Sequence, residues 1–291
     1  MLPASSSPLA VSPGFIEVAL TPGQTYEGEF LILNPAVDNT TSHYLVSVGS
    51  LAYNDASYSP DFNDFSDYNQ IVDWISIESP KGELAPQDKR AIKFKITVPA
   101  DAPAGGQYAS LLVSSEDPSA SDQTSGIAVA ARSRIAILLY STVSGQTREE
   151  GAVLENNVPG VFFNQPIKTS SLITNTGNVH IKARYTLRVY PLFSDEELYT
   201  NEESPVVNTV IPDTTLYSEK VWSDTPLLGL FRVQQEIDFN GQLSTQETIT
   251  LVAPTWFVIL ATLFLASVFY FLFDHTRRRR PRKLRNAIKS P

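Results

Sequence analysis

Alternating apolar and polar positions recur along the first 145 residues and predict short β-strands. The clearest example is Ala91–Val98, in which apolar residues fall on one face and polar residues on the other, the period-2 pattern of a half-buried strand. Turn-forming clusters such as Pro22-Gly23 and Pro103–Gly106 separate these segments. The predicted strands are Ile16–Leu20, Tyr26–Leu33, Tyr44–Tyr53, Trp74–Ile77, Ala91–Val98, Tyr108–Val113 and one or two strands within Gly126–Val143.

A second series of strands follows the polar segment Ser144–Gly151, whose sequence SGQTREEG favours a boundary between domains. Turns are indicated at Asn175–Asn178 and Asn240-Gly241. Short strands at this spacing are typical of immunoglobulin-like sandwiches. We therefore predict an all-β fold with two tandem immunoglobulin-like β-sandwiches, at 1–145 and 150–251. The strands predicted in the second are Val161–Phe163, Ser170–Thr174, Ala183–Tyr190, Val206–Ile211, Leu216–Trp222, Phe231–Phe239 and Gln246–Leu251.

One uncharged apolar run, Val252–Phe273, predicts a single C-terminal transmembrane helix. At about 1.5 Å per residue it reaches about 33 Å, close to the thickness of a hydrocarbon core. Trp256 and Tyr270 lie near its two ends, where aromatic side chains anchor a span at the membrane surface. The alternative, a buried helix of a large globular core, conflicts with the basic sequence RRRRPRK that follows soon after the run.

The net charge of −9 hides a division of charge on either side of this run. Residues 274–291 hold eight of the 22 basic residues and one of the 31 acidic residues, a net charge of +7, which leaves −16 for the rest. Basic flanks stay in the cytoplasm, so we expect a single-pass plasma-membrane protein with a cytoplasmic tail at 274–291 and an extracellular N-terminal part. The basic anchor residues are Arg277, Arg278, Arg279 and Arg280.

Export requires a signal peptide, and the first ten residues, MLPASSSPLA, lack its basic start and apolar core. We therefore expect this sequence to be either a mature form from which a signal peptide was removed or a chain produced without its signal peptide.

Several short motifs occur in an order that resembles a known family. Phe15–Asn34 reads FIEVALTPGQTYEGEFLILN, and Leu84–Val113 reads LAPQDKRAIKFKITVPADAPAGGQYASLLV. In the second half, SLITNTGNVHIK is followed by Pro212 and by GLFRV from Gly229. This order resembles the WxL-interacting surface proteins of Gram-positive bacteria. The resemblance implies a peptidoglycan-binding first domain, a second immunoglobulin-like domain linked to host binding, one membrane helix and a basic tail.

The segment 54–73, NDASYSPDFNDFSDYNQIVD, is the most unusual local sequence. Its oxygen-rich side chains are of the type that Ca²⁺ prefers, although the spacing is not that of an EF-hand loop. Three interpretations remain open: a calcium site, a loop that packs its aromatic rings on the sandwich, and a partner-binding loop. The calcium candidates are Asp61, Asn63, Asp64 and Asp67. The partner-binding candidates are Tyr58, Phe62, Phe65 and Tyr68.

An acidic module would bind peptidoglycan through hydrogen bonds and aromatic stacking, because it repels anionic polymers. Candidates for stacking are Tyr53, Tyr58, Tyr68 and Trp74. For Trp74, which lies close to Val72 and Ile75, a place in the core is the alternative.

The sequence offers little material for catalysis. There are no cysteines, and His43, His180 and His275 do not form a metal-binding pattern. No nucleophile elbow, phosphate-binding loop or HExxH motif occurs. The acidic main part argues against nucleic acid as a partner. We therefore expect neither enzymatic activity nor a cofactor.

These observations predict a non-enzymatic surface protein for binding or adhesion, with a cell-wall polymer or a surface protein as its partner and the lipid bilayer as its anchor. An accessory subunit of a membrane complex, assembled through the helix and ectodomain, is the alternative. The weak small-residue pattern of the helix gives that alternative little support.

Overall fold

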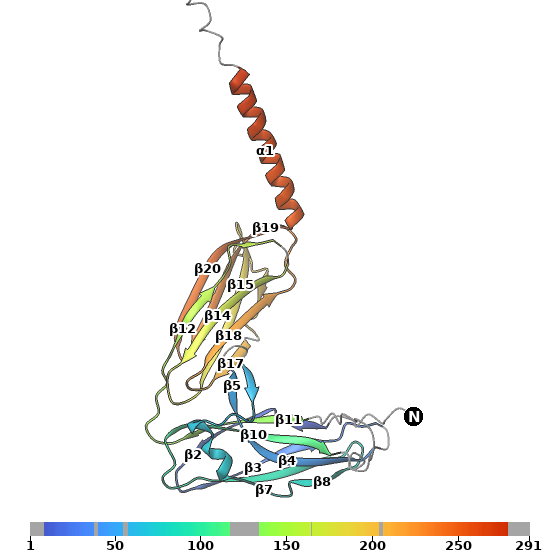
Figure 1. Cartoon of the computed structure of the whole chain (residues 1–291), viewed down its shortest axis with the longest axis vertical. Helices are drawn as coiled ribbons and strands as arrows, with labels where there is room; N and C mark the ends of the chain where they lie inside the picture. Colours follow the sequence, from blue (N-terminus) through green and yellow to red (C-terminus); the bar gives the residue numbers. More distant parts are fainter. Residues whose placement is uncertain are drawn as a thin grey trace, which may run out of the picture.

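The computed structural model describes residues 9–37, 40–54, 58–116, 134–163, 165–203 and 206–278. Figure 1 shows two β-sandwiches that meet at an angle, with helix α1 (Thr255–Arg278) extending from the far end of the second sandwich. The predicted fold class, two tandem immunoglobulin-like sandwiches followed by one C-terminal helix, is confirmed. Part of the strand region predicted at Gly126–Val143 lies outside the described residues.

The first sandwich has one sheet of four strands and one of five. The first sheet has the order β1 (Ala10–Ser12), β3 (Thr25–Leu33), β9 (Lys89–Thr97) and β7 (Ile75–Ile77). The second has the order β2 (Phe15–Leu20), β11 (Arg134–Val143), β10 (Gly105–Glu116), β4 (Ser42–Ser50) and β8 (Lys81–Leu84). Strand β2 pairs with β11 in parallel, and the other pairs are antiparallel.

Apolar burial holds the first sandwich together. Strand β9 shows the predicted alternation, since Ile92, Phe94 and Ile96 are at most 1% exposed. Phe94 packs against Phe30 of the neighbouring strand β3 with ring centroids 6.4 Å apart. Burying each side chain of this size stabilises the fold by about 1.5–3 kcal/mol, so this face of β9 is a main contributor to the core.

The second sandwich repeats the two-sheet design. One sheet has the order β12 (Gly151–Asn157), β14 (Ile167–Asn175) and β18 (Thr215–Trp222). The other has the order β13 (Val161–Phe162), β20 (Gln242–Val252), β19 (Gly229–Phe239), β15 (Ile181–Pro191) and β16 (Tyr199–Thr200), and β17 (Val206–Val210) also pairs with β15. Tyr185, Leu187 and Val189 of β15 are buried, as their alternation predicted.

Each sandwich contains a buried asparagine at the end of a central strand, and the two asparagines make matching hydrogen bonds. In the first, the Asn34 side chain donates to the carbonyls of Thr40 and Leu84, and its oxygen accepts from the Ala36 amide. In the second, Asn175 donates to Val179 and Val210 and accepts from the Gly177 amide. The backbones match as well: the Asn34 carbonyl accepts from the Gln87 amide and the Asn175 carbonyl from the Asp213 amide.

Gln87 and Asp213 follow a proline and have positive φ angles of 62° and 56°. The two sandwiches therefore share one local design for the end of a central strand, built from a strand-ending asparagine and a Pro-containing turn that crosses to it.

Three sequence expectations are wrong in detail. The helix begins at Thr255 and not at Val252, because Val252 still pairs with Gly229 in the sheet. The segment 54–73 is not only a loop: β5 (Ala52–Asn54) and β6 (Ser59–Asp61) form a hairpin, and Asp67–Trp74 forms the 3-10 helix η1. Strand β12 was not among the predicted strands, and it begins at Gly151, the last residue of the segment that the sequence indicated as a domain boundary.

Candidate functional site at the junction of the two sandwiches

Asn178 forms one side of the contact between the sandwiches. Its carbonyl accepts from the Gly106 amide of β10 at 2.6 Å. Its side-chain amide donates to the carbonyls of Ala104 and Gln146, and its side-chain oxygen accepts from the Arg148 amide. The NTGN turn of the second sandwich is thus bonded both to the first sandwich and to the connecting segment 144–150.

Gly105 makes this close approach feasible. Its φ angle is 124°, a conformation that residues with a side chain rarely adopt. A Cβ atom at this position would lie 2.7 Å from the Asn178 carbonyl oxygen. The sequence indicated turns at both places, but nothing in either motif indicated that the two turns meet.

A chain of polar side chains forms the second contact. Glu17 of edge strand β2 accepts from Lys182 Nζ at 2.7 Å through Oε2, and His180 Nε2 lies 3.2 Å from its Oε1. His180 Nδ1 lies 3.4 Å from the Tyr108 hydroxyl, and its ring packs edge-on against the Tyr108 ring. Because a carboxylate only accepts, Nε2 carries the proton toward Glu17, and Nδ1 accepts from Tyr108.

The surroundings shift the pKa values of both titratable partners. Burial lowers the pKa of His180, and Glu17 only partly opposes this effect. The hydrogen bond from Lys182 is the largest cause that lowers the pKa of Glu17, with a further contribution from His180. The surroundings therefore favour the ionised carboxylate of Glu17 and the neutral imidazole of His180.

The 54–73 segment forms the third contact. The Tyr58 hydroxyl donates to the Thr209 carbonyl of β17 and accepts from the Ile211 amide at 3.2 Å. The Tyr58 ring stacks on Tyr53 with centroids 4.2 Å apart. The Tyr68 hydroxyl donates to Asp213 Oδ2 at 3.0 Å. Figure 1 shows the β5–β6 hairpin rising toward β17.

Apolar packing completes the third contact. Leu51, Tyr108 and Tyr140 of the first sandwich form one buried cluster with Ile211 of the second. The predicted aromatic residues Phe62 and Tyr68 pack against this cluster. Phe65, in contrast, is 63% exposed and is not among the residues of the junction.

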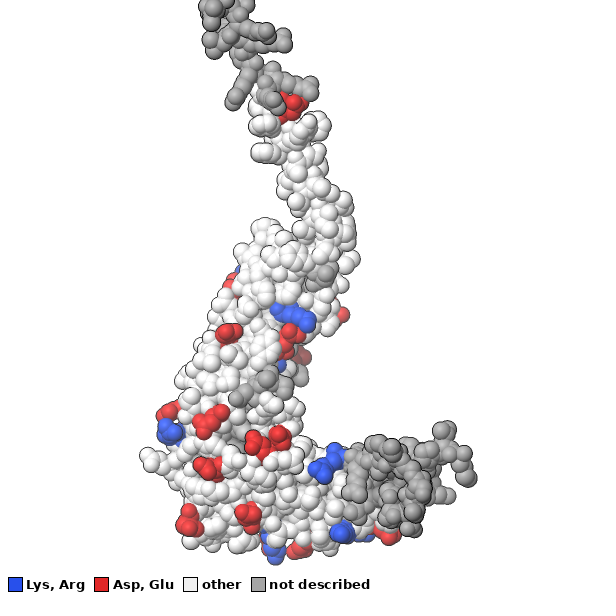
Figure 2. Space-filling model, in the orientation of Figure 1, with Lys and Arg blue, Asp and Glu red and all other residues white. Residues whose placement is uncertain are grey.

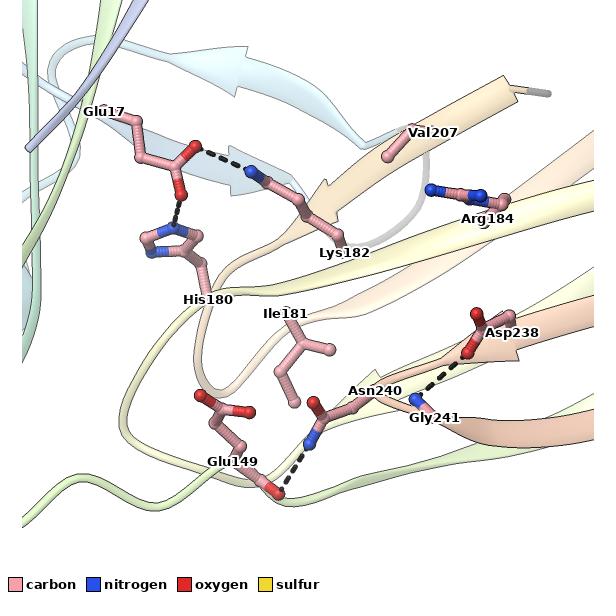
Figure 3. A pocket seen from close by; sticks show the side chains of 10 residues that line it. All are labelled: Glu17, Glu149, His180, Ile181, Lys182, Arg184, Val207, Asp238, Asn240 and Gly241. Carbon is pink, nitrogen blue, oxygen red and sulfur yellow. Dashed lines mark hydrogen bonds and ion pairs between the residues drawn. The ribbon is translucent and has the colours of Figure 1, made fainter. Parts of the chain in front are cut away.

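A hollow of about 350 Å³ opens beside the polar chain and is bordered by both sandwiches (Figure 3). Its walls mix acidic and basic side chains, and Glu17 points from the first sandwich toward the second. Such a surface suits a polar ligand held by hydrogen bonds. The residues that line it are Glu17, Glu149, His180, Ile181, Lys182, Arg184, Val207, Asp238, Asn240 and Gly241.

The calcium candidates are not brought together. Within the described part of the chain, no cluster of three or more His, Cys, Asp or Glu side chains could hold a metal ion. Asp61 instead accepts from the Asn63 amide at 2.9 Å, and Asp67 occupies the first turn of η1. Asp64 is exposed.

The stacking candidates take structural positions in the first sandwich. The Tyr53 hydroxyl is hydrogen-bonded to that of Tyr140 at 2.6 Å. Trp74 ends η1 and packs, partly buried, against the first core, which is the alternative that the sequence left open for it.

The anchor candidates lie on or beyond α1. Trp256 is exposed in the first turn and Tyr270 in the C-terminal half. Arg277 and Arg278 are the last helical residues, whereas Arg279 and Arg280 lie outside the described residues. Residues 255–276 have a mean hydropathy of 2.3 and no burial against the sandwiches, so this helix is long and apolar enough to cross a membrane.

No protein-family model matches the sequence, and no curated protein matches it. Among solved structures, the class 5 fimbriae chaperone CfaA is similar with a TM-score of 0.38 and 12% identity, over 85% of this chain and 100% of that chain. The E. coli chaperone DraB has a TM-score of 0.37 and 14% identity, over 84% of this chain and 97% of that chain.

A protein of unknown function from Porphyromonas gingivalis W83 has a TM-score of 0.31 and 13% identity, over 84% of this chain and 100% of that chain. Identities and TM-scores this low do not indicate a shared ligand or role.

Proposed function

We propose that this chain is a non-enzymatic, single-pass surface protein that holds a binding module at a fixed distance and angle from the plasma membrane. The second sandwich and the junction act as a spacer. The first sandwich presents the binding surface to a cell-wall polymer or to a surface protein. The resemblance to WxL-interacting proteins favours peptidoglycan among these ligands.

The connection between β20 and α1 carries this proposal. Only Ala253 and Pro254 separate the last strand from the helix, and both are buried. The Ala253 amide donates to the Phe162 carbonyl at 2.9 Å, which fixes the connection to the sandwich. Because no free linker intervenes, a membrane that holds α1 also holds the second sandwich.

The division of charge supports the orientation. The net charge of +7 at 274–291 follows the helix, and −16 precedes it. By the positive-inside rule, the basic end remains in the cytoplasm and the sandwiches lie outside. The helix has about 36 Å of length, enough for a bilayer core.

Protease treatment of intact cells tests the orientation. With an epitope tag after Pro291, we expect external protease to remove the sandwiches and to leave a short tagged fragment. A tagged chain of full length after treatment contradicts the orientation, provided that permeabilised cells show cleavage.

Sedimentation with purified cell wall tests the binding role. The full chain in detergent should co-sediment with peptidoglycan, and Phe65→Ser should weaken this binding, because Phe65 is the exposed member of the predicted partner-binding residues. Replacing α1 with an unrelated apolar span should leave wall binding unchanged. If the replacement instead removes a co-purifying membrane protein while wall binding is absent, the chain acts as an accessory subunit.

A further inference from the structure

Exposed apolar side chains gather at the end of the second sandwich from which α1 emerges. Phe193 is 95% exposed and Leu227 is 68% exposed. Single exposed apolar residues are ordinary, whereas a contiguous group on one end of a domain marks an interaction surface. We call this group the apolar rim; it consists of Phe163, Phe193, Leu227, Leu228 and Leu230.

Strand pairing brings the rim residues to one place. Gly229, which follows Leu228, pairs with Val252 at the end of β20. The Leu192 amide donates to the Leu230 carbonyl at 3.0 Å, which sets Phe193 beside this strand end. Phe163 directly follows β13, whose last residue pairs with Val252. Three connecting segments from distant parts of the sequence therefore converge where the helix begins.

The short connection fixes the rim close to the helix entry point. From Val252 to Thr255 the chain spans at most about 11 Å, given 3.8 Å between consecutive Cα atoms. Trp256, 62% exposed in the first helical turn, is a side chain of the type that sits at the level of lipid headgroups. The rim and the membrane surface are thus held at nearly the same height.

Two of the three segments that form the rim carry little charge. Residues 159–165 contain no charged side chain, and 223–230 contain only Asp224. The third segment is acidic just after Phe193: Asp195 pairs with Arg232 at 2.7 Å, Glu197 accepts from the Tyr190 hydroxyl at 2.7 Å, and Glu196 is exposed. Figure 2 shows that the part of the second sandwich adjoining α1 is uncharged on the face in view.

We propose that the apolar rim inserts into the interfacial layer of the bilayer that α1 crosses, so that the second sandwich stands on the membrane with a defined tilt. This proposal rests on the proposed membrane anchoring. The apolar face of an interfacial amphipathic helix enters about 5–10 Å into the boundary between headgroups and acyl chains, and we expect a comparable depth for the rim. The rim has no basic cluster, so its insertion depends on apolar contact and not on anionic lipid.

Site-specific fluorescence in lipid vesicles tests the proposal. The chain has no cysteines, so the single variants Phe193→Cys and Leu227→Cys can each carry one environment-sensitive label. The full chain is reconstituted in phosphatidylcholine vesicles that contain nitroxide-labelled lipid. We expect labels at both positions to be quenched and their emission to shift to the blue, with no further change when anionic lipid is added.

Leu243→Cys provides the matched control. Leu243 is also an exposed leucine (62%) and lies at the opposite end of β20, nine residues from Val252, or about 30 Å along the strand. Its label should remain unquenched. A label at Phe264→Cys, in the middle of α1, reports whether the helix itself is in the bilayer.

The outcomes separate the two proposals. If position 264 is quenched while positions 193 and 227 behave like 243, the rim proposal is wrong and the anchor stands. If position 264 is not quenched, membrane anchoring itself is wrong. A blue shift at 193 and 227 without quenching by lipid means that protein covers the rim, which also overturns the proposal.

Discussion

His180 Nε2 lies 3.2 Å from Glu17 Oε1, and this contact joins a loop of the second sandwich to an edge strand of the first. The two residues are 163 positions apart in the sequence. His180 is buried at the junction, whereas Glu17 remains partly exposed. The contact therefore makes the relative placement of the sandwiches dependent on a titratable pair.

Acidification should weaken the junction. Burial lowers the pKa of His180, and the Lys182 hydrogen bond lowers that of Glu17, so each group binds fewer protons when docked than when separated. The stability contributed by His180 is fully present above its ordinary pKa of 6.5 and is lost as pH falls through the lowered value. The contribution of Glu17 is lost below its ordinary value of 4.5.

Energy transfer between dyes on the two sandwiches measures this effect. Between about pH 8 and about pH 5, across the titration range of histidine, we expect the transfer efficiency to change reversibly. His180→Gln keeps a polar side chain but removes the titration, so its efficiency should be nearly constant above the Glu17 range. Glu149 also influences His180, and Glu149→Gln is the control that should retain the pH dependence. An unchanged dependence in His180→Gln contradicts the assignment.

Removal of the Tyr58 hydroxyl should destabilise the junction. Tyr58→Phe leaves the Thr209 carbonyl and the Ile211 amide without their partner, and a buried polar group without a partner costs about 1–3 kcal/mol. The measurement is the free energy of unfolding in urea. Phe65→Ser, in the same segment but exposed, should change it by less than about 0.5 kcal/mol. Equal effects of the two substitutions would mean that Tyr58 does not hold the junction.

The sequence predicted the strands well because their burial follows a local period. In β9, each second residue from Ile92 onward is buried, and no distant residue is needed to recognise the pattern. Helix η1 was missed because it is short and only Asn69 and Ile71 are buried in it. Both have distant partners: the Asn69 side chain donates to the carbonyls of Leu51 and Tyr108, and the Ile71 amide donates to Gln107 Oε1.

The junction could not be predicted, because its contacts join residues that are far apart in the sequence and carry no common motif. For the aromatic residues of 54–73 the sequence left packing on the sandwich and partner binding both open, and the surface that Tyr58 contacts in this structure belongs to the same chain. A Gly-Gly pair and the NTGN turn were the available signals for Gly105 and Asn178. They indicated backbone turns and not the pairing between them.

Overpacking at Gly28 should destabilise the first sandwich. A Cβ atom there would lie 2.5 Å from Phe94 Cζ, and Phe94 is fully buried. Gly28→Val is expected to lower the free energy of unfolding by about 1–3 kcal/mol, and Phe94→Ala by about 3–5 kcal/mol. Gly14→Val is the control, since a Cβ there meets nothing within 4 Å. A charged residue, as in Phe94→Asp, should prevent folding of this sandwich, measured by circular dichroism.

Asn34 and Asn175 are the buried asparagines at the end of a central strand in each sandwich. Replacing either with aspartate should selectively unfold the sandwich that contains it. Asn175 and Asn34 each donate to two backbone carbonyls, and a carboxylate of the same shape cannot donate. Asn175→Asp should therefore lower the stability of the second sandwich by about 2–6 kcal/mol, because two buried carbonyls each lose a partner at about 1–3 kcal/mol. Trp222 lies in the second core and Trp74 against the first, so their fluorescence distinguishes the two.

The measurement uses two background variants, each of which retains one of the two core tryptophans. In the Trp74→Phe background, the urea midpoint of the change in Trp222 emission should fall with Asn175→Asp and hardly change with Asn34→Asp. In the Trp222→Phe background, the midpoint reported by Trp74 should respond in the reverse order. Trp256, on α1 and outside both cores, contributes a constant background. If either aspartate substitution shifts the unfolding transitions of both sandwiches equally, the sandwiches unfold as one cooperative unit. The junction then contributes more to stability than either asparagine.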